Sequence, residues 1–85
     1  AKKEIYIGDF YRKRKACEAA IARYKTVIDE YADLGFDERM YYEVAECYVK
    51  LEQKEEANYY IDMLLIKFPA GEYAAKATKL KEGLD

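Results

Sequence analysis

Side chains that could carry out catalysis are scarce in this sequence of 85 residues. It contains no His and no Ser, so the commonest general base and a common nucleophile are both missing. The aliphatic hydroxyls are those of Thr26 and Thr78, and no Gly-rich phosphate loop occurs. Adjacent carboxylates such as Asp29 and Glu30 are interpreted as charges on the solvent side of a helix. We therefore expect no enzyme activity, no cofactor and no metal site, and a binding function is the alternative.

The two cysteines, Cys17 and Cys47, do not have the spacing of a metal site. We interpret them as small, semi-buried packing residues, because free Cys often behaves as a small hydrophobe. A disulfide between them would require the second and third predicted helices to bring them within bonding distance. Cysteine usage therefore leaves the redox compartment open.

Composition and charge exclude several classes of partner. Hydrophobic residues make up 52% of the chain and charged residues 38%, with one Pro and four Gly, which is typical of an ordered, helix-rich protein. The net charge of −2 and the pI near 5.3 give no reason to expect binding to nucleic acid or to an anionic membrane. No apolar run reaches the roughly 18 residues of a transmembrane helix, and no signal peptide is visible before the first helical pattern.

The stretch 40–69 predicts two helices joined by a short polar turn. Apolar residues recur at helical spacing in both halves. They are Tyr41, Val44, Ala45, Tyr48 and Leu51 in the first half and Ala57, Ile61, Leu64 and Phe68 in the second. Pro69 ends the second helix, because the residue before a proline disfavours helical backbone. Large side chains flank small Ala45 and Ala57, so neighbouring helices can approach closely at these two positions.

The same pattern of large and small residues occurs 37 positions upstream. The residues that correspond to Val44, Ala45, Tyr48, Ala57, Ile61 and Leu64 are Ile7, Gly8, Tyr11, Ala20, Tyr24 and Val27. This order resembles the tetratricopeptide (TPR) repeat, whose usual period of about 34 residues implies a three-residue insertion within 33–36. Gly8 at the position of Ala45 predicts a tight helix crossing, which would offset the low helix propensity of Gly.

The TPR resemblance implies an all-α fold, with two helical hairpins and a C-terminal capping helix in a right-handed α-solenoid. We expect a single domain over 1–85, which would be a fragment of a longer protein. Repeat 1 is expected at about 3–33, repeat 2 at about 37–70, and the capping helix at about 72–83.

In such a solenoid the first helix of each hairpin lines the concave groove that binds a partner. Residues one step off the packing stripe should face this groove. We predict a protein-binding groove formed by Ile5, Asp9, Arg12, Lys13, Tyr42, Glu46, Val49 and Lys50. Tyr42 is the predicted anchor, because Tyr41 fills the core position and adjacent residues diverge by about 100° around a helix.

Two parts of the predicted groove have a structural alternative. Tyr42 could instead cover neighbouring aliphatic surface. The basic run 12–15 could be an anion or acidic-partner site, or a helix C-terminus whose cations stabilise the last carbonyls. The Lys/Asn clamp that some TPR domains use for a partner's C-terminal carboxylate is missing, so binding of chaperone tails is not expected. The corresponding positions hold Ile5, Asp9, Tyr42 and Glu46.

Three segments carry a more specific resemblance. They are Gly8-Asp9-Phe10-Tyr11 leading to Ala19-Ala20-Ile21-Arg23-Tyr24, then Tyr31-Ala32-Asp33, and last Phe68-Pro69 with Gly71-Glu72-Tyr73-Ala74. Together they resemble the C-terminal repeats of BamD/YfiO/ComL-type outer-membrane assembly lipoproteins over nearly the whole chain. The sequence departs from that family at Ala32, where the family usually has Pro, and it shows neither upstream repeats nor a lipidated N-terminal Cys.

This family resemblance implies a non-catalytic protein–protein interaction scaffold in the machine that folds β-barrel proteins into the outer membrane. The implied partner is the periplasmic part of the barrel insertase, and the implied location is the periplasmic face of the outer membrane. Lipid anchoring follows only if the intact protein has a lipidated Cys. The alternative is a generic TPR adaptor that binds a peptide or a partner domain in its groove, which would be cytoplasmic if the family resemblance does not hold. An enzyme would need catalytic residues from another domain.

Overall fold

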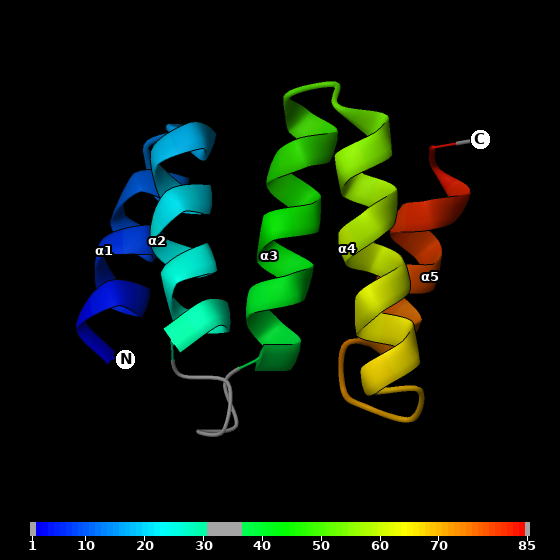
Figure 1. The fold of residues 1–85 in the computed structure, drawn as a ribbon. Helices are drawn as coiled ribbons and strands as arrows, with labels where there is room; N and C mark the ends of the chain where they lie inside the picture. The colour runs from blue at the N-terminus through cyan, green and yellow to red at the C-terminus, as the bar shows by residue number, and fades with distance from the viewer. Residues whose placement is uncertain (1, 31–36, 85) are drawn as a thin grey trace.

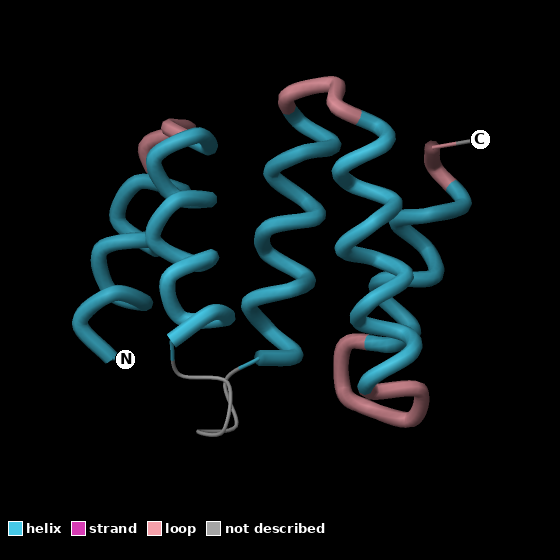
Figure 2. The backbone as a smooth tube through the Cα atoms, viewed as in Figure 1, coloured by secondary structure: helices cyan, strands magenta, loops and turns pink. Residues whose placement is uncertain are grey.

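The computed structural model describes residues 2–30 and 37–84, and these residues form an array of helices (Figure 1). The helices are α1 (Lys2–Lys13), α2 (Cys17–Glu30), α3 (Asp37–Lys50), α4 (Lys54–Lys67) and α5 (Ala74–Glu82). Successive helices run in opposite directions (Figure 2). The turns that join α1 to α2 and α3 to α4 lie at one end of the array, and the loop between α4 and α5 lies at the other (Figure 2). The predicted all-α helical repeat is confirmed. None of the helices in the described ranges combines the length and the apolar character needed to cross a membrane.

The turns within the two hairpins have the same backbone geometry. Lys15 has a φ of 63° and Glu52 a φ of 60°, and the two residues are 37 positions apart. In each turn the next amide donates a hydrogen bond of 2.9 Å to the carbonyl five residues earlier, which belongs to Tyr11 in one hairpin and Tyr48 in the other. A left-handed residue with this bond is a Schellman ending of a helix. The repeat of 37 positions in the sequence is therefore also a repeat in the backbone.

Gly8 allows α1 to pack tightly against Tyr24 of α2. A Cβ at this position would lie 2.6 Å from Cε1 of Tyr24, whose side chain is fully buried. In the second hairpin the corresponding residues are Ala45 and Ile61, both buried. The first hairpin thus combines the smallest residue with a large ring, and the second combines Ala with a mid-sized side chain. The tight crossing predicted at Gly8 is confirmed.

The buried residues form two core clusters. The first core cluster contains Cys17, Ala20, Ile21, Tyr24, Val27, Met40, Val44, Cys47, Tyr48 and Ala57, and it joins α2 to α3. The second core cluster contains Tyr41, Ala45, Ile61, Leu64 and Ala77, and it joins the second hairpin to α5. α5 thus packs against the second hairpin through buried Ala77 and half-buried Leu80. The insertion predicted within 33–36 and the end predicted for repeat 1 at about residue 33 lie outside the described residues.

A contact from α3 fixes the start of α5. The carboxylate of Glu38 accepts a hydrogen bond of 2.8 Å from the backbone N–H of Tyr73, which is the N-cap residue of α5. A negative charge at the first turn of a helix is favourable, because the N–H groups there have no partner within the helix. Gly71 makes room for this carboxylate, since a Cβ at Gly71 would overlap with Glu38. α5 begins at Ala74, two residues after the predicted start of the capping helix.

Candidate partner-binding surface

Contacts between side chains join α1, α3 and the start of α5 along one side of the array, which we call the α1–α3–α5 face. The predicted groove residues occupy four kinds of position on or near it. Asp9 and Arg12 take part in a network of charges, and Tyr42 and Glu46 contact one another. Ile5 and Val49 are half-buried against the first core cluster. Lys13 and Lys50 are exposed at the margins.

The charge network consists of Asp9, Arg12, Tyr24, Arg39 and Glu43, from α1, α2 and α3. The carboxylate of Asp9 accepts hydrogen bonds from the Tyr24 hydroxyl at 2.5 Å and from Nη2 of Arg39 at 2.6 Å. The same Arg39 nitrogen lies 3.3 Å from Oε2 of Glu43. Nε of Arg12 donates to the Tyr24 oxygen at 3.1 Å and lies 3.5 Å from Glu43. The two cations and two carboxylates balance one another.

Burial and charge act in opposite directions within the charge network. Burial raises the pKa of Glu43, although the neighbouring charges of Arg12 and Arg39 oppose this shift. Burial alone would lower the pKa of Arg39, but its hydrogen bond to Asp9 and the charges around it outweigh that effect and raise the pKa. The pKa of Tyr24 is also raised, first by burial and then by its bond to Asp9. At neutral pH the network therefore holds charged arginines and a neutral Tyr24 hydroxyl.

Tyr42 lies between α3 and α5. Its ring centroid is 5.3 Å from that of Tyr73, and its hydroxyl donates to a carboxylate oxygen of Glu46 at 3.4 Å. Burial, followed by the charge of Glu46, raises the pKa of Tyr42. The ring packs against the second core cluster, which fits the alternative of a covering role. It also lines an open cavity of about 280 Å³ together with Lys76, Lys79 and Leu80.

The two exposed lysines of the predicted groove border different cavities. Lys13 lines a cavity of about 170 Å³ with Tyr6, Asp9 and Phe10. Lys50 lines another, of about 390 Å³, with Lys15, Cys17 and Leu51. The predicted set is thus spread along the array and does not converge on one hollow. An extended contact with a partner surface suits this arrangement better than capture of a small molecule does.

Sequence reasoning missed Arg39 and Glu43, which complete the charge network. Both belong to α3, at a spacing of four residues, and they present a cation and a carboxylate in the reverse order to Asp9 and Arg12. That reversal was the available signal, because two such pairs can match each other across neighbouring helices. Glu43 is only 7% exposed, so its burial depends on its cationic partners.

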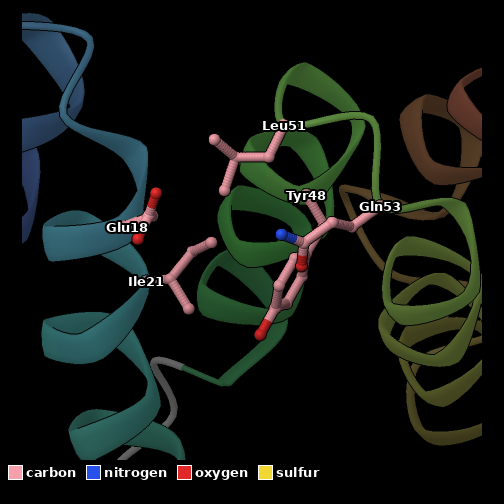
Figure 3. Close-up of a pocket in the computed structure, with 5 residues that line it drawn as sticks. All are labelled: Glu18, Ile21, Tyr48, Leu51 and Gln53. Atoms are coloured by element: carbon pink, nitrogen blue, oxygen red, sulfur yellow. The ribbon is translucent and has the colours of Figure 1, made fainter.

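A further cleft lies between α2 and α3, away from the charge network. Figure 3 shows Glu18 and Ile21 of α2 facing Tyr48 of α3 and Leu51, which directly follows that helix, with Gln53 beside them. Its volume is about 280 Å³. No residue of the predicted groove lines this cleft.

Comparisons with known proteins place these features in a family context. Residues 1–60 match the YfiO family, described as "Outer membrane lipoprotein". Over 80 residues the chain is 35% identical to "Outer membrane protein assembly factor BamD" of Rickettsia prowazekii (strain Madrid E). This alignment covers 94% of the chain and 32% of the relative, so the chain spans about a third of that protein's length. No solved structure gives a significant match.

Proposed function

The chain belongs to the YfiO family of outer membrane lipoproteins, and on this premise we propose that it is a non-catalytic protein-binding segment in outer-membrane β-barrel assembly. The observation that carries the proposal is the family match over residues 1–60, together with the assembly role named for the relative from Rickettsia prowazekii. The proposed location is the periplasmic face of the outer membrane. A lipid anchor is part of the proposal only if the intact protein has a lipidated Cys.

The proposed partner is a protein, and the periplasmic domains of the barrel insertase are the candidate to test. Support comes from the α1–α3–α5 face, which offers an aromatic ring, exposed lysines and balanced charges over three helices. Such a mixture of a rigid aromatic and surrounding polar groups is typical of protein interfaces. The proposed contact residues are Ile5, Asp9, Arg12, Lys13, Tyr42, Glu46, Val49 and Lys50.

Tyr42 is the proposed anchor of this contact. Its ring is already held by Tyr73 and by the second core cluster, so little side-chain freedom would be lost on binding. The cavity beside it has two lysines at its edge, Lys76 and Lys79, which suit a partner carrying a carboxylate. Asp9 and Arg12 are also engaged within the chain, so besides their proposed contact with the partner they would keep α1 in line with α3.

The test is a titration of isotope-labelled chain with the insertase's periplasmic domains, followed through backbone amide shifts. We expect shifts around Lys13, Tyr42, Glu46 and Lys50. Tyr42→Ala should weaken binding by about tenfold or more, as loss of an interface anchor typically does. Tyr59→Ala is the matched control, because Tyr59 is an exposed tyrosine on α4, and it should leave the affinity unchanged.

Two outcomes would count against parts of the proposal. Shifts confined to α2 and α4 would keep the partner but reject the proposed face. An absence of shifts near 1 mM, which corresponds to binding weaker than about 4 kcal/mol, would reject this partner for the chain and favour a generic adaptor. Circular dichroism of each variant separates a lost contact from a lost fold.

A further inference from the structure

The two cysteines are neighbours in the folded chain. Cys17 is the first residue of α2 and Cys47 lies in the last turn of α3, and both belong to the first core cluster. Their exposed fractions are 5% and 1%. Both cysteines are buried, as expected of packing residues. A disulfide between them would require α2 and α3 to bring the two residues together, and these two helices pack against each other.

Cys47 shares its buried surroundings with Cys17, since both belong to the first core cluster. Its pKa is raised to about 12, first by burial and next by side-chain hydrogen bonding with Cys17. Cys47 is therefore an inert thiol by itself, and the group beside it is another thiol.

A route from solvent reaches Cys17. This residue lines the cavity of about 390 Å³ that Lys15 and Lys50 also border. Leu51 lines both this cavity and the neighbouring cleft of Figure 3, so the two hollows adjoin. The two lysines give the entrance a positive charge, which favours an anionic reagent.

From the shared core cluster, the packing of α2 against α3 and the cationic entrance, we infer that Cys17 and Cys47 are a site of intramolecular disulfide formation, with a small anionic disulfide such as oxidised glutathione as the oxidant. The inference goes beyond the proposed function and does not depend on the partner. Disulfides persist in oxidising compartments, which include the bacterial periplasm. The bond would join α2 to α3 and so fix one hairpin against the other.

The reaction is thiol–disulfide exchange in two steps. The thiolate of Cys17 attacks one sulfur of the oxidant, whose S–S bond breaks, and the released thiolate takes up the proton that Cys17 lost. Cys47 then gives up its proton and attacks Sγ of Cys17, and the second half of the oxidant leaves as a thiol. Two cysteine thiols are oxidised to one disulfide, and one disulfide of the oxidant is reduced to two thiols.

The test is incubation of the folded chain with oxidised glutathione, followed by unfolding, alkylation of free thiols and measurement of the intact mass. We expect a monomer that has lost two hydrogen atoms, takes up no alkyl group and carries no glutathione. Cys47→Ser should stop at the first step and retain one glutathione on Cys17. Cys17→Ser should react far more slowly, because its one remaining thiol is the buried Cys47.

A wild-type chain that keeps two alkylatable thiols, or that forms only dimers, would overturn the inference. Equal rates of glutathione uptake by Cys17→Ser and Cys47→Ser would overturn the proposed order of attack. The same equilibrium measured in urea gives an independent check. A link between residues 17 and 47 should form a few hundred-fold less favourably in the unfolded chain, by about the entropy of closing that loop. Equal values in the folded and unfolded chain would mean that the fold does not pair these thiols.

Discussion

The two hairpins have the same backbone geometry in their turns, but some equivalent side chains are exposed in one hairpin and buried in the other. Tyr6 and Phe10 of α1 are 73% and 45% exposed. Their equivalents 37 positions later are Glu43, which is 7% exposed, and Cys47, which is buried. The hydrophobic pair faces solvent because it lies on the outer side of the first described helix, whereas α2 packs against the equivalent side of α3. Burial in this array therefore follows the position of a helix more than the polarity of its residues.

The hairpins also fill the same internal space in different ways. The first hairpin has Gly8 and Tyr24 at the two positions where the second hairpin has Ala45 and Ile61. The exchange has a consequence for the surface. The Tyr24 ring carries its hydroxyl to Asp9 and Arg12, so the first hairpin connects its core to the charge network. The side chain of Ile61 has no polar atom and therefore cannot link the core of the second hairpin to surface charges by a hydrogen bond.

The largest expected effect on stability comes from replacing Gly8 of the first hairpin with Ala, the residue at the equivalent position of the second. Gly8→Ala should lower the free energy of unfolding by about 1–3 kcal/mol, because its Cβ would overlap with the buried Tyr24 ring. This loss is net of the gain of up to about 1 kcal/mol that Ala brings to a helix. Urea denaturation followed by circular dichroism measures the change.

The double variant Gly8→Ala with Tyr24→Ile tests whether the pairs are interchangeable. It gives the first hairpin the residues of the second, so its loss should be smaller than the sum of the two single losses by at least about 0.5 kcal/mol. Additive losses would show that the two positions do not share one space.

The second effect concerns the charge network. Arg39→Met keeps most of the side-chain bulk but removes the partner of Asp9 and Glu43, and we expect a loss of about 1–2 kcal/mol. Lys2 is the equivalent residue of the first hairpin and is exposed. Lys2→Met is therefore the matched control and should change the stability by less than about 0.5 kcal/mol. Equal effects of the two variants in urea denaturation would mean that the network contributes nothing measurable.

The helices themselves were predictable from the sequence, because apolar spacing and the 37-residue shift depend on residues close along the chain. Pro69 marked the end of α4, which the structure places at Lys67, one residue before its C-cap Phe68. The start of α5 was not predictable in the same way. It depends on Glu38 and Tyr73, which are 35 positions apart and show no common pattern in the sequence.

For the candidate surface, the sequence predicted only the direction in which each side chain points around its own helix. The angle of Asp9 around α1 indicated that it lies off the packing stripe. It could not indicate that Arg39 of α3 would reach Asp9 and occupy its carboxylate. Tyr42 illustrates the same limit, since its contact with Tyr73 depends on how the loop before α5 returns to α3. Which partner such residues bind stays a prediction for the titration.

A third effect tests how the second hairpin holds α5. Glu38→Ala removes the acceptor at the N-cap of that helix, and a loss of about 1 kcal/mol is typical for a cap. Hydrogen exchange should accelerate in α5 before it does so in α3. Glu72→Ala provides the control, because Glu72 is an exposed carboxylate in the same loop. If both variants accelerate exchange equally, general charge near the helix matters and the specific contact does not.

Glu43 should make a smaller contribution to the pH dependence of the free energy of unfolding. Its pKa lies above the ordinary glutamate value of about 4.5, mainly because of burial, so the folded chain holds this proton more tightly than the unfolded chain does. The contribution of Glu43 to stability should therefore fall as the pH rises from 4.5 through its folded pKa. Glu43→Gln removes this contribution, so the stability of the variant relative to wild type should increase over the same range. Urea denaturation at several pH values measures it, and a relative decrease would mean that Arg12 and Arg39 outweigh burial.

The smallest expected effect concerns Tyr6 and Phe10, the two exposed hydrophobic side chains of α1. Tyr6→Ala should change the free energy of unfolding by no more than about 0.5 kcal/mol, because most of the ring is in solvent. Phe10 should be somewhat more sensitive, since its ring contacts Tyr11 and has the guanidinium of Arg14 4.5 Å from its centroid. Urea denaturation at two protein concentrations checks both variants. A loss above about 1 kcal/mol that shrinks on dilution would show that a second copy covers this side of α1 in solution, and the contrast with Glu43 would then be one of partners rather than of exposure.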